Sequence, residues 1–165
     1  MVNSKFNLST NYSIDCIRDG AVVWTINKDN LVVNEGLEYV MDRTFGADDQ
    51  VEWRIGLLTE SNVSPGDTMS IHQYAFVEFM GTTNVNRPIA TFVDSGIEFN
   101  KYSYTANDVQ VMVAATGYLT GAFMTSGIVK GEEVGILYGV AEFPASRSVI
   151  PGDALMITVK VTAQG

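Results

Sequence analysis

The stretches VSPGDTMSI, residues 63–71, and VIPGDALMI, residues 149–157, each place Pro-Gly-Asp between apolar side chains and agree at five of nine positions. Proline sets the φ of the second residue of a tight turn, and glycine supplies the positive φ that the third residue of a type II turn needs. An aspartate in such a turn commonly accepts hydrogen bonds from nearby backbone N–H groups. The two stretches therefore predict tight turns, and they indicate a chain of strands rather than of helices.

The segment ALMITVKVTA, residues 154–163, follows the second turn and alternates with period two. One face of the predicted strand is apolar, and it carries Leu155, Ile157, Val159 and Val161. The other face is more polar, and it carries Met156, Thr158, Lys160 and Thr162. Such alternation is typical of a strand with one face in the core and one in solvent.

Other runs rich in β-branched and aromatic residues are separated by Gly, Pro, Asn or Asp, which predicts about eight strands in all. These further runs are residues 21–26, 52–59, 74–79, 88–93, 97–104, 109–119 and 135–143. Short strands with short breaks predict an all-β sandwich, jelly roll or barrel.

One helix is predicted over about residues 34–44, with Asn34 as its N-cap and Gly46 as its stop. The apolar positions i, i+3 and i+4 are Leu37, Val40 and Met41. We expect this helix to cover one open end or edge of the strands.

The first twenty residues also alternate, from Phe6 to Cys16, yet they precede everything that resembles a compact core. Two interpretations remain open at this stage. The segment is either an ordinary edge strand or an arm that pairs with a neighbouring subunit by strand addition. The predicted organisation is therefore an N-terminal strand or extended arm over residues 1–20 and one β-sandwich domain over residues 21–165.

The composition argues against several classes of partner. The 165 residues carry a net charge of −9, which disfavours nucleic acid and anionic membrane surfaces. No apolar run approaches the length of a spanning helix, and the stretch MVNSKFNLST lacks the apolar core of a signal peptide. We therefore expect synthesis in a cytoplasm. Cys16 is the single cysteine, and we interpret it as a small buried side chain.

The sequence predicts no catalytic residue, no cofactor and no metal site. His72 is the sole histidine and has no partner at a useful spacing, so a hydrogen-bonded structural role is expected. The acidic pairs Asp48-Asp49 and Glu132-Glu133 stand in loops beside glycine or alanine, where solvated side chains are expected. Asp67 and Asp153 belong to the two turns.

A series of short motifs, here called the motif series, extends through the chain between about residues 31 and 162. In sequence it comprises Asn34-Glu35-Gly36-Leu37, Trp53, Gly56-Leu57, Gly66-Asp67-Thr68-Met69-Ser70, His72, Glu78-Phe79, Asn86-Arg87-Pro88, Ser95-Gly96, Gly121, Phe123, Ser126, Gly135-Ile136-Leu137-Tyr138, Ala141, Phe143, Gly152-Asp153, Leu155 and Ile157. This series resembles a family of head decoration, or cement, proteins of tailed bacteriophages.

The resemblance implies a jelly-roll-like antiparallel β-sandwich that binds the major capsid protein on the outer capsid surface, after synthesis in a bacterial host. It implies homotrimers at threefold positions, with dimers as the other arrangement. The N-terminal segment would then contact a neighbour through Phe6, Leu8, Tyr12 and Ile14. An alternative is a tail- or fibre-associated module whose exposed aromatic side chains bind a host glycan.

Overall fold

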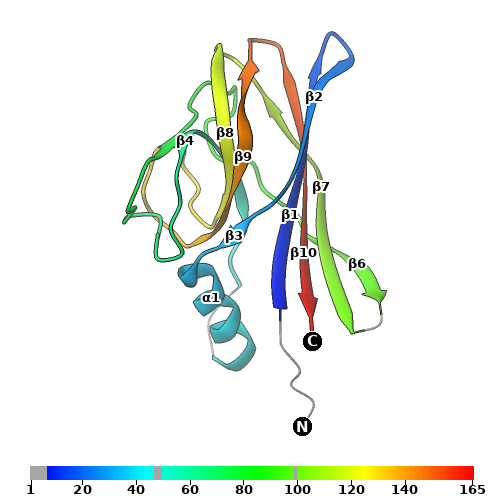
Figure 1. Ribbon diagram of the computed structural model, residues 1–165, viewed down its shortest axis with the longest axis vertical. Coiled ribbons are helices and arrows are strands. Elements are labelled where there is room, and N and C mark those ends of the chain that lie inside the picture. The colour runs from blue at the N-terminus through cyan, green and yellow to red at the C-terminus, as the bar shows by residue number, and fades with distance from the viewer. Residues whose placement is uncertain (1–6, 47–49, 99) are drawn as a thin grey trace.

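The computed structural model describes residues 7–46, 50–98 and 100–165, and it places ten strands in two antiparallel sheets that face each other (Figure 1). The prediction of an all-β antiparallel sandwich is confirmed, with ten strands in place of about eight. Sheet A has the order β2 (Ala21–Asp29), β1 (Asn7–Arg18), β10 (Ala154–Gln164), β7 (Lys101–Met112) and β6 (Val93–Glu98). Sheet B has the order β3 (Leu31–Val32), β9 (Leu137–Val149), β8 (Gly117–Thr125), β4 (Arg54–Ser61) and β5 (Phe76–Glu78).

Strands from the two ends of the chain pair in a nested order. β1 pairs with β10, β3 with β9, and β4 with β8, and each pair is antiparallel. This wrapping of the first part of the chain against the last is the jelly-roll-like feature of the sandwich. Every one of these pairings joins residues far apart in sequence, so the fold depends on non-local contacts.

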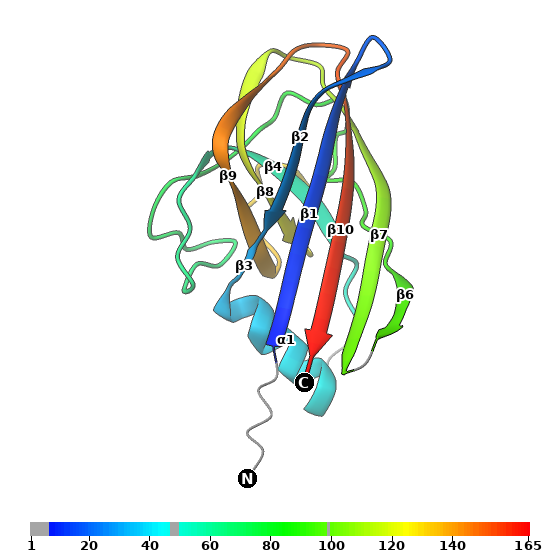
Figure 2. The ribbon, with the colours of Figure 1, turned by 45° about the vertical axis from the view of Figure 1, so that its right-hand side comes forward.

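The part of the N-terminal segment that forms β1, residues 7–18, lies inside sheet A. β1 pairs with β10 from Asn7↔Gln164 to Ile17↔Ala154, and on its other side it pairs with β2 (Figure 2). The predicted strand is therefore present, but as a central strand of the chain's own sheet rather than an edge strand or a separate arm. The reason is that an alternating apolar pattern is the same for a central and an edge antiparallel strand, and the partner strand β10 lies at the far end of the sequence.

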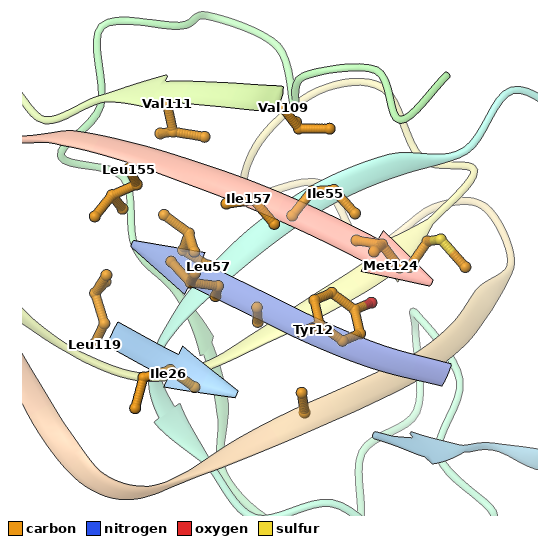
Figure 3. Close-up of a cluster of buried hydrophobic side chains, with 14 of the residues drawn as sticks. Tyr12, Ile26, Ile55, Leu57, Val109, Val111, Leu119, Met124, Leu155 and Ile157 are labelled. Carbon is orange, nitrogen blue, oxygen red and sulfur yellow. The ribbon is translucent and has the colours of Figure 1, made fainter. Parts of the chain in front are cut away.

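The main core lies between the two sheets (Figure 3). Tyr12 from β1 lies beside Leu155 and Ile157 from β10 on the sheet A side, and Ile55 from β4 faces them from sheet B. Ile14 of β1 belongs to the same core and pairs in register with Ile157. The predicted apolar face of β10 is confirmed, since Leu155, Ile157 and Val159 are fully buried and Val161 packs partly buried against them.

Sheet B is covered on its outer face as well. A second apolar cluster joins Leu58 of β4 and Phe123 of β8 to Met69 of the loop between β4 and β5. Met69 is nearly inaccessible to solvent, so it anchors this loop over the sheet. As a result β4 is buried on both faces over Ile55–Leu58, whereas a half-buried strand would bury only one face.

The helix α1 (Asn34–Phe45) lies at the end of the sandwich where β1 starts and β10 ends (Figures 1 and 2). The predicted helix is confirmed, but its N-cap is Val33 rather than Asn34. Gly36 lets the helix approach β9 closely, since a Cβ at this position would lie 2.2 Å from the carbonyl oxygen of Tyr138. Among the helices of the described residues, none has both the length and the apolar character that crossing a membrane requires.

Both Pro-Gly-Asp stretches form the expected turns with the same hydrogen bonds. Asp67 donates its N–H to the carbonyl of Ser64 at 3.0 Å, and its Oδ2 accepts the N–H of Ser64 at 2.9 Å. Asp153 makes the same two bonds to Ile150, at 3.1 and 2.9 Å. Gly152 has φ +93°, as a type II turn needs, whereas Gly66 does not have a positive φ. The type II prediction is therefore wrong for the first turn, which opens a loop rather than a strand.

Three of the predicted strands differ from the observed ones. The run 97–104 is divided between β6, which ends at Glu98, and β7, which starts at Lys101. Residues 88–93 make only isolated bridges before β6 begins, because the segment runs across the end of β4 at Ile89. The run 109–119 is divided between β7 and β8, with a break over residues 113–116. The same run of apolar residues thus serves two sheets.

Candidate functional site

His72 is held by its own loop. Its Nε2 lies 3.0 Å from the carbonyl oxygen of Met69, and its ring stacks on Phe76 with 4.2 Å between centroids. These contacts fit the structural role that the sequence predicted. They also tie the loop to β5.

The acidic residues do not gather into a ligand set. Across residues 7–46, 50–98 and 100–165, no three His, Cys, Asp or Glu side chains are placed so as to hold a metal ion. Glu132 and Glu133 are exposed, as expected, and Asp48-Asp49 lies outside the described residues. Asp67 and Asp153 are buried, and both carboxylates are hydrogen-bonded to backbone N–H groups of their turns.

Asp153 carries a further contact that joins the second turn to β1. Arg18 donates from Nε and Nη2 to the two carboxylate oxygens of Asp153, at 2.8 Å each. This bond lowers the pKa of Asp153 below its ordinary value. Burial, with a smaller contribution from Asp153, raises the pKa of the Cys16 thiol to about 11. Cys16 is inaccessible to solvent, in agreement with its interpretation as a buried side chain.

Of the four residues predicted to contact a neighbour, the structure describes Leu8, Tyr12 and Ile14, and these do not form one exposed surface. Tyr12 and Ile14 are fully buried in the chain's own core, so in this fold they have no exposed surface to offer a partner. Burial raises the pKa of the Tyr12 phenol far above its ordinary value. Leu8 packs partly buried at the edge of the core. Phe6 lies outside the described residues.

An aromatic hollow of roughly 420 Å³ opens between the sheets near α1. Its lining includes Tyr39 from α1, Trp53, Tyr102 and Tyr104 from β7, and Tyr138 from β9. Trp53 meets Tyr39 and Tyr138 edge to face, with centroid distances of 5.1 and 5.3 Å. Trp53 thus lines this hollow and does not lie wholly within the core with Ile55 and Leu57.

A second candidate surface lies on and beside β5, at the end of sheet B. Four large apolar side chains of this segment are exposed over 47% to 69% of their surface: Ile71, Tyr74, Val77 and Met80. We call these four residues the β5 surface. Isolated exposed apolar residues are ordinary, whereas adjacent ones mark a contact site, and Val77 and Met80 of this group line one hollow.

A buried ion pair holds the β5 surface in place. Arg87 donates from Nε and Nη2 to the carboxylate oxygens of Glu78, at 2.9 and 2.8 Å. Only 1% of the Arg87 side chain and 7% of the Glu78 side chain are exposed. Arg87 also donates to the carbonyl of Glu132, and Glu78 accepts the N–H of Gly131. The pair therefore joins β5 to the segment that follows it and to the loop of Gly131 and Glu132, which is distant in sequence.

Aromatic packing against Phe123 of β8 supports the same region. Phe76 meets Phe123 edge to face at 4.9 Å, and the Arg87 guanidinium lies 5.3 Å from the centre of the Phe123 ring. The sequence contained Glu78 and Arg87 in the motif series but no signal that they pair. The position of Glu78 within an apolar run is unusual, but it does not indicate which residue pairs with Glu78.

In comparisons with protein-family models, with curated proteins and with solved structures, nothing matches this chain.

Proposed function

We propose that this chain is a virion structural protein that binds the outer surface of a tailed-phage capsid as a decoration protein. The observation that carries the proposal is the β5 surface, a set of exposed apolar side chains on a segment held rigid by buried hydrogen bonds. The motif series between residues 31 and 162 supports it. The proposed mechanism is passive, since contact area repeated over many symmetric copies stabilises the capsomer contacts.

The charge of the chain fits this role. A net charge of −9 favours solubility of the free protein and disfavours contact with the DNA inside a capsid. The partners in this proposal are the major capsid protein and further copies of the chain. We expect a homotrimer at a threefold position, with a dimer as the alternative. The protein would be made in the cytoplasm of a bacterial host.

The test is the location and copy number of the chain in purified virions. Cryo-electron microscopy should show its density on the outer capsid surface, and quantitative mass spectrometry should give hundreds of copies per particle. Density restricted to the tail, or a handful of copies, would refute the capsid assignment.

The aromatic hollow favours a second candidate function, a glycan-binding module of a tail or fibre. Tyr104 is exposed, and it lies edge to face against Tyr102, with ring centres 5.3 Å apart. Sugar rings commonly stack on such side chains. The control residue is Tyr118, an exposed tyrosine on β8 outside the hollow. Binding on a glycan array that is lost in Tyr104→Ala and kept in Tyr118→Ala would support this function. The absence of any glycan binding would exclude it.

A further inference from the structure

The β5 surface borders a hollow of roughly 350 Å³. Apolar and aromatic side chains form one side of it, namely Met69, Phe76, Val77 and Met80. The rest of the lining is the segment Gly131–Glu133, His72 and the ion pair of Glu78 and Arg87. The hollow is therefore large enough for an apolar side chain of a partner, and its walls are chemically suited to one.

The walls of this hollow are fixed before any partner arrives. Two hydrogen bonds tie the Glu78–Arg87 pair to the Gly131–Glu133 segment: Arg87 donates to the carbonyl of Glu132 at 3.0 Å, and the Gly131 N–H donates to Glu78 at 2.7 Å. The two residues are joined to each other by bonds of 2.9 and 2.8 Å. The side chain of Met80 packs against Gly131, whose added Cβ would lie 3.3 Å from the Met80 methyl group. A preformed hollow binds with a smaller loss of conformational entropy than a mobile one.

The rim of the hollow is acidic. Glu132 and Glu133 line the hollow, and both are exposed. Among the described residues that line the hollow, the one Lys or Arg is Arg87, and its charge is already paired with Glu78. The surface thus combines an apolar centre with unpaired negative charge at its edge.

β5 also ends its sheet. It pairs with β4 along one side only, and sheet B continues no further beyond it among the described residues. An end strand beside a hollow suits an extended segment better than a helix, because the strand sets the direction along which alternate side chains of the partner point.

We infer that the β5 surface binds an extended segment of the capsid partner that places one apolar side chain in the hollow and lysine or arginine beside Glu132 and Glu133. The argument is charge complementarity around an apolar centre. This inference rests on the proposed function and specifies the chemistry of the contact.

The experiment measures binding of the purified full chain to capsids assembled without it, by co-sedimentation at low and high salt. Two variants alter the hollow: Glu132→Lys/Glu133→Lys reverses the rim charges, and Met80→Ala shortens a wall. Helix α1 offers matched controls, because Met41 is 50% exposed against 53% for Met80, and Glu38 and Asp42 are exposed. The controls are therefore Met41→Ala and Glu38→Lys/Asp42→Lys.

We expect the rim variant to weaken binding by about tenfold or more at low salt and by less at high salt, since salt screens exposed charges. Met80→Ala should weaken binding at both salt concentrations, and the α1 controls should bind like the unchanged chain. Circular dichroism confirms that each variant is folded. If the unchanged chain binds and both hollow variants bind equally well, the inference is wrong and the proposed function stands. If the unchanged chain does not bind capsids, both are wrong.

Discussion

The buried pair between Arg87 and Glu78 offers the sharpest test of the structure. We predict that Arg87→Met destabilises the fold strongly although it replaces a charged residue by an apolar one of similar length. The substitution leaves the Glu78 carboxylate, which is 7% exposed, with the N–H of Gly131 as its remaining donor at 2.7 Å. A buried charge without its counter-ion is costly because the protein interior solvates it poorly.

The expected size follows from the burial of the pair. Removing one partner of a buried ion pair costs about 3–5 kcal/mol in the free energy of unfolding. For a chain of this size, each kcal/mol lowers the melting temperature by about 2–4 °C, so the loss is roughly 6–20 °C. Replacing both residues, as Arg87→Met/Glu78→Leu, removes both charges together. We expect the double variant to lose clearly less stability than the sum of the two single variants.

The assay is urea unfolding at pH 7, followed by tryptophan fluorescence and by circular dichroism, on Arg87→Met, Glu78→Leu and the double variant. The matched control is Glu52→Gln, because Glu52 pairs with Arg54 but its side chain is 53% exposed, and exposed pairs contribute at most about 1 kcal/mol. Hydrogen exchange should also accelerate over residues 71–80 and 126–135 in Arg87→Met. A loss no larger than that of Glu52→Gln, or strictly additive single variants, would refute the reasoning.

Three further predictions concern the two turns and the strand beside them. The bond from Arg18 holds the pKa of Asp153 below its ordinary value of 3.8. The Asp153 carboxylate therefore contributes its full stabilisation above pH 3.8, and this stabilisation is lost as the pH falls through the lowered pKa of the folded state. In Asp153→Asn, the free energy of unfolding should therefore fall less steeply between about pH 5 and pH 2 than in the unchanged chain, as measured by urea titrations. The Cys16 thiol should not react with a disulfide reagent at pH 8 in the folded chain, because the side chain is buried and burial raises its pKa to about 11. It should react fully in guanidinium chloride. Reaction in the folded state would contradict the buried position of Cys16. Gly152→Ala should lower the free energy of unfolding by about 1–2 kcal/mol, measured by thermal or urea unfolding, because Gly152 has φ +93°. Gly66→Ala should be nearly neutral, because Gly66 has no positive φ and a Cβ there would meet open space. Equal losses of stability would contradict the difference between the two turns.

Local patterns in the sequence were sufficient for the elements that depend on neighbouring residues. The period of two predicted the burial of Leu155, Ile157 and Val159 on β10, although Thr162 of the predicted polar face is buried as well. The turn aspartates Asp67 and Asp153 cap backbone N–H groups as expected. The helix after residue 33 was also predicted to within one residue at its start. Each of these depends on interactions within a few residues, which a local pattern records.

Features that depend on distant residues were not predictable in this way. β1 was placed at an edge or on an arm, because alternation says which face is buried but not how many neighbours a strand has. β4 is buried on both faces only because the loop carrying Met69 folds over it. The burial of Tyr12 and Ile14, two of the residues predicted to contact a neighbour, was not predicted for the same reason, since both face a sheet formed by residues far along the chain.

The sequence by itself determined the class of this protein, an acidic all-β chain with tight Pro-Gly-Asp turns and one short helix. The tertiary structure alone decided which surface is available for contact. Arg87 and Glu78 become a buried pair, and Val77 and Met80 become exposed beside the acidic rim, only when β5 and the Gly131–Glu133 segment are brought together. The physical reason is that pairing and burial of charges depend on distances in space, which no spacing along the sequence encodes.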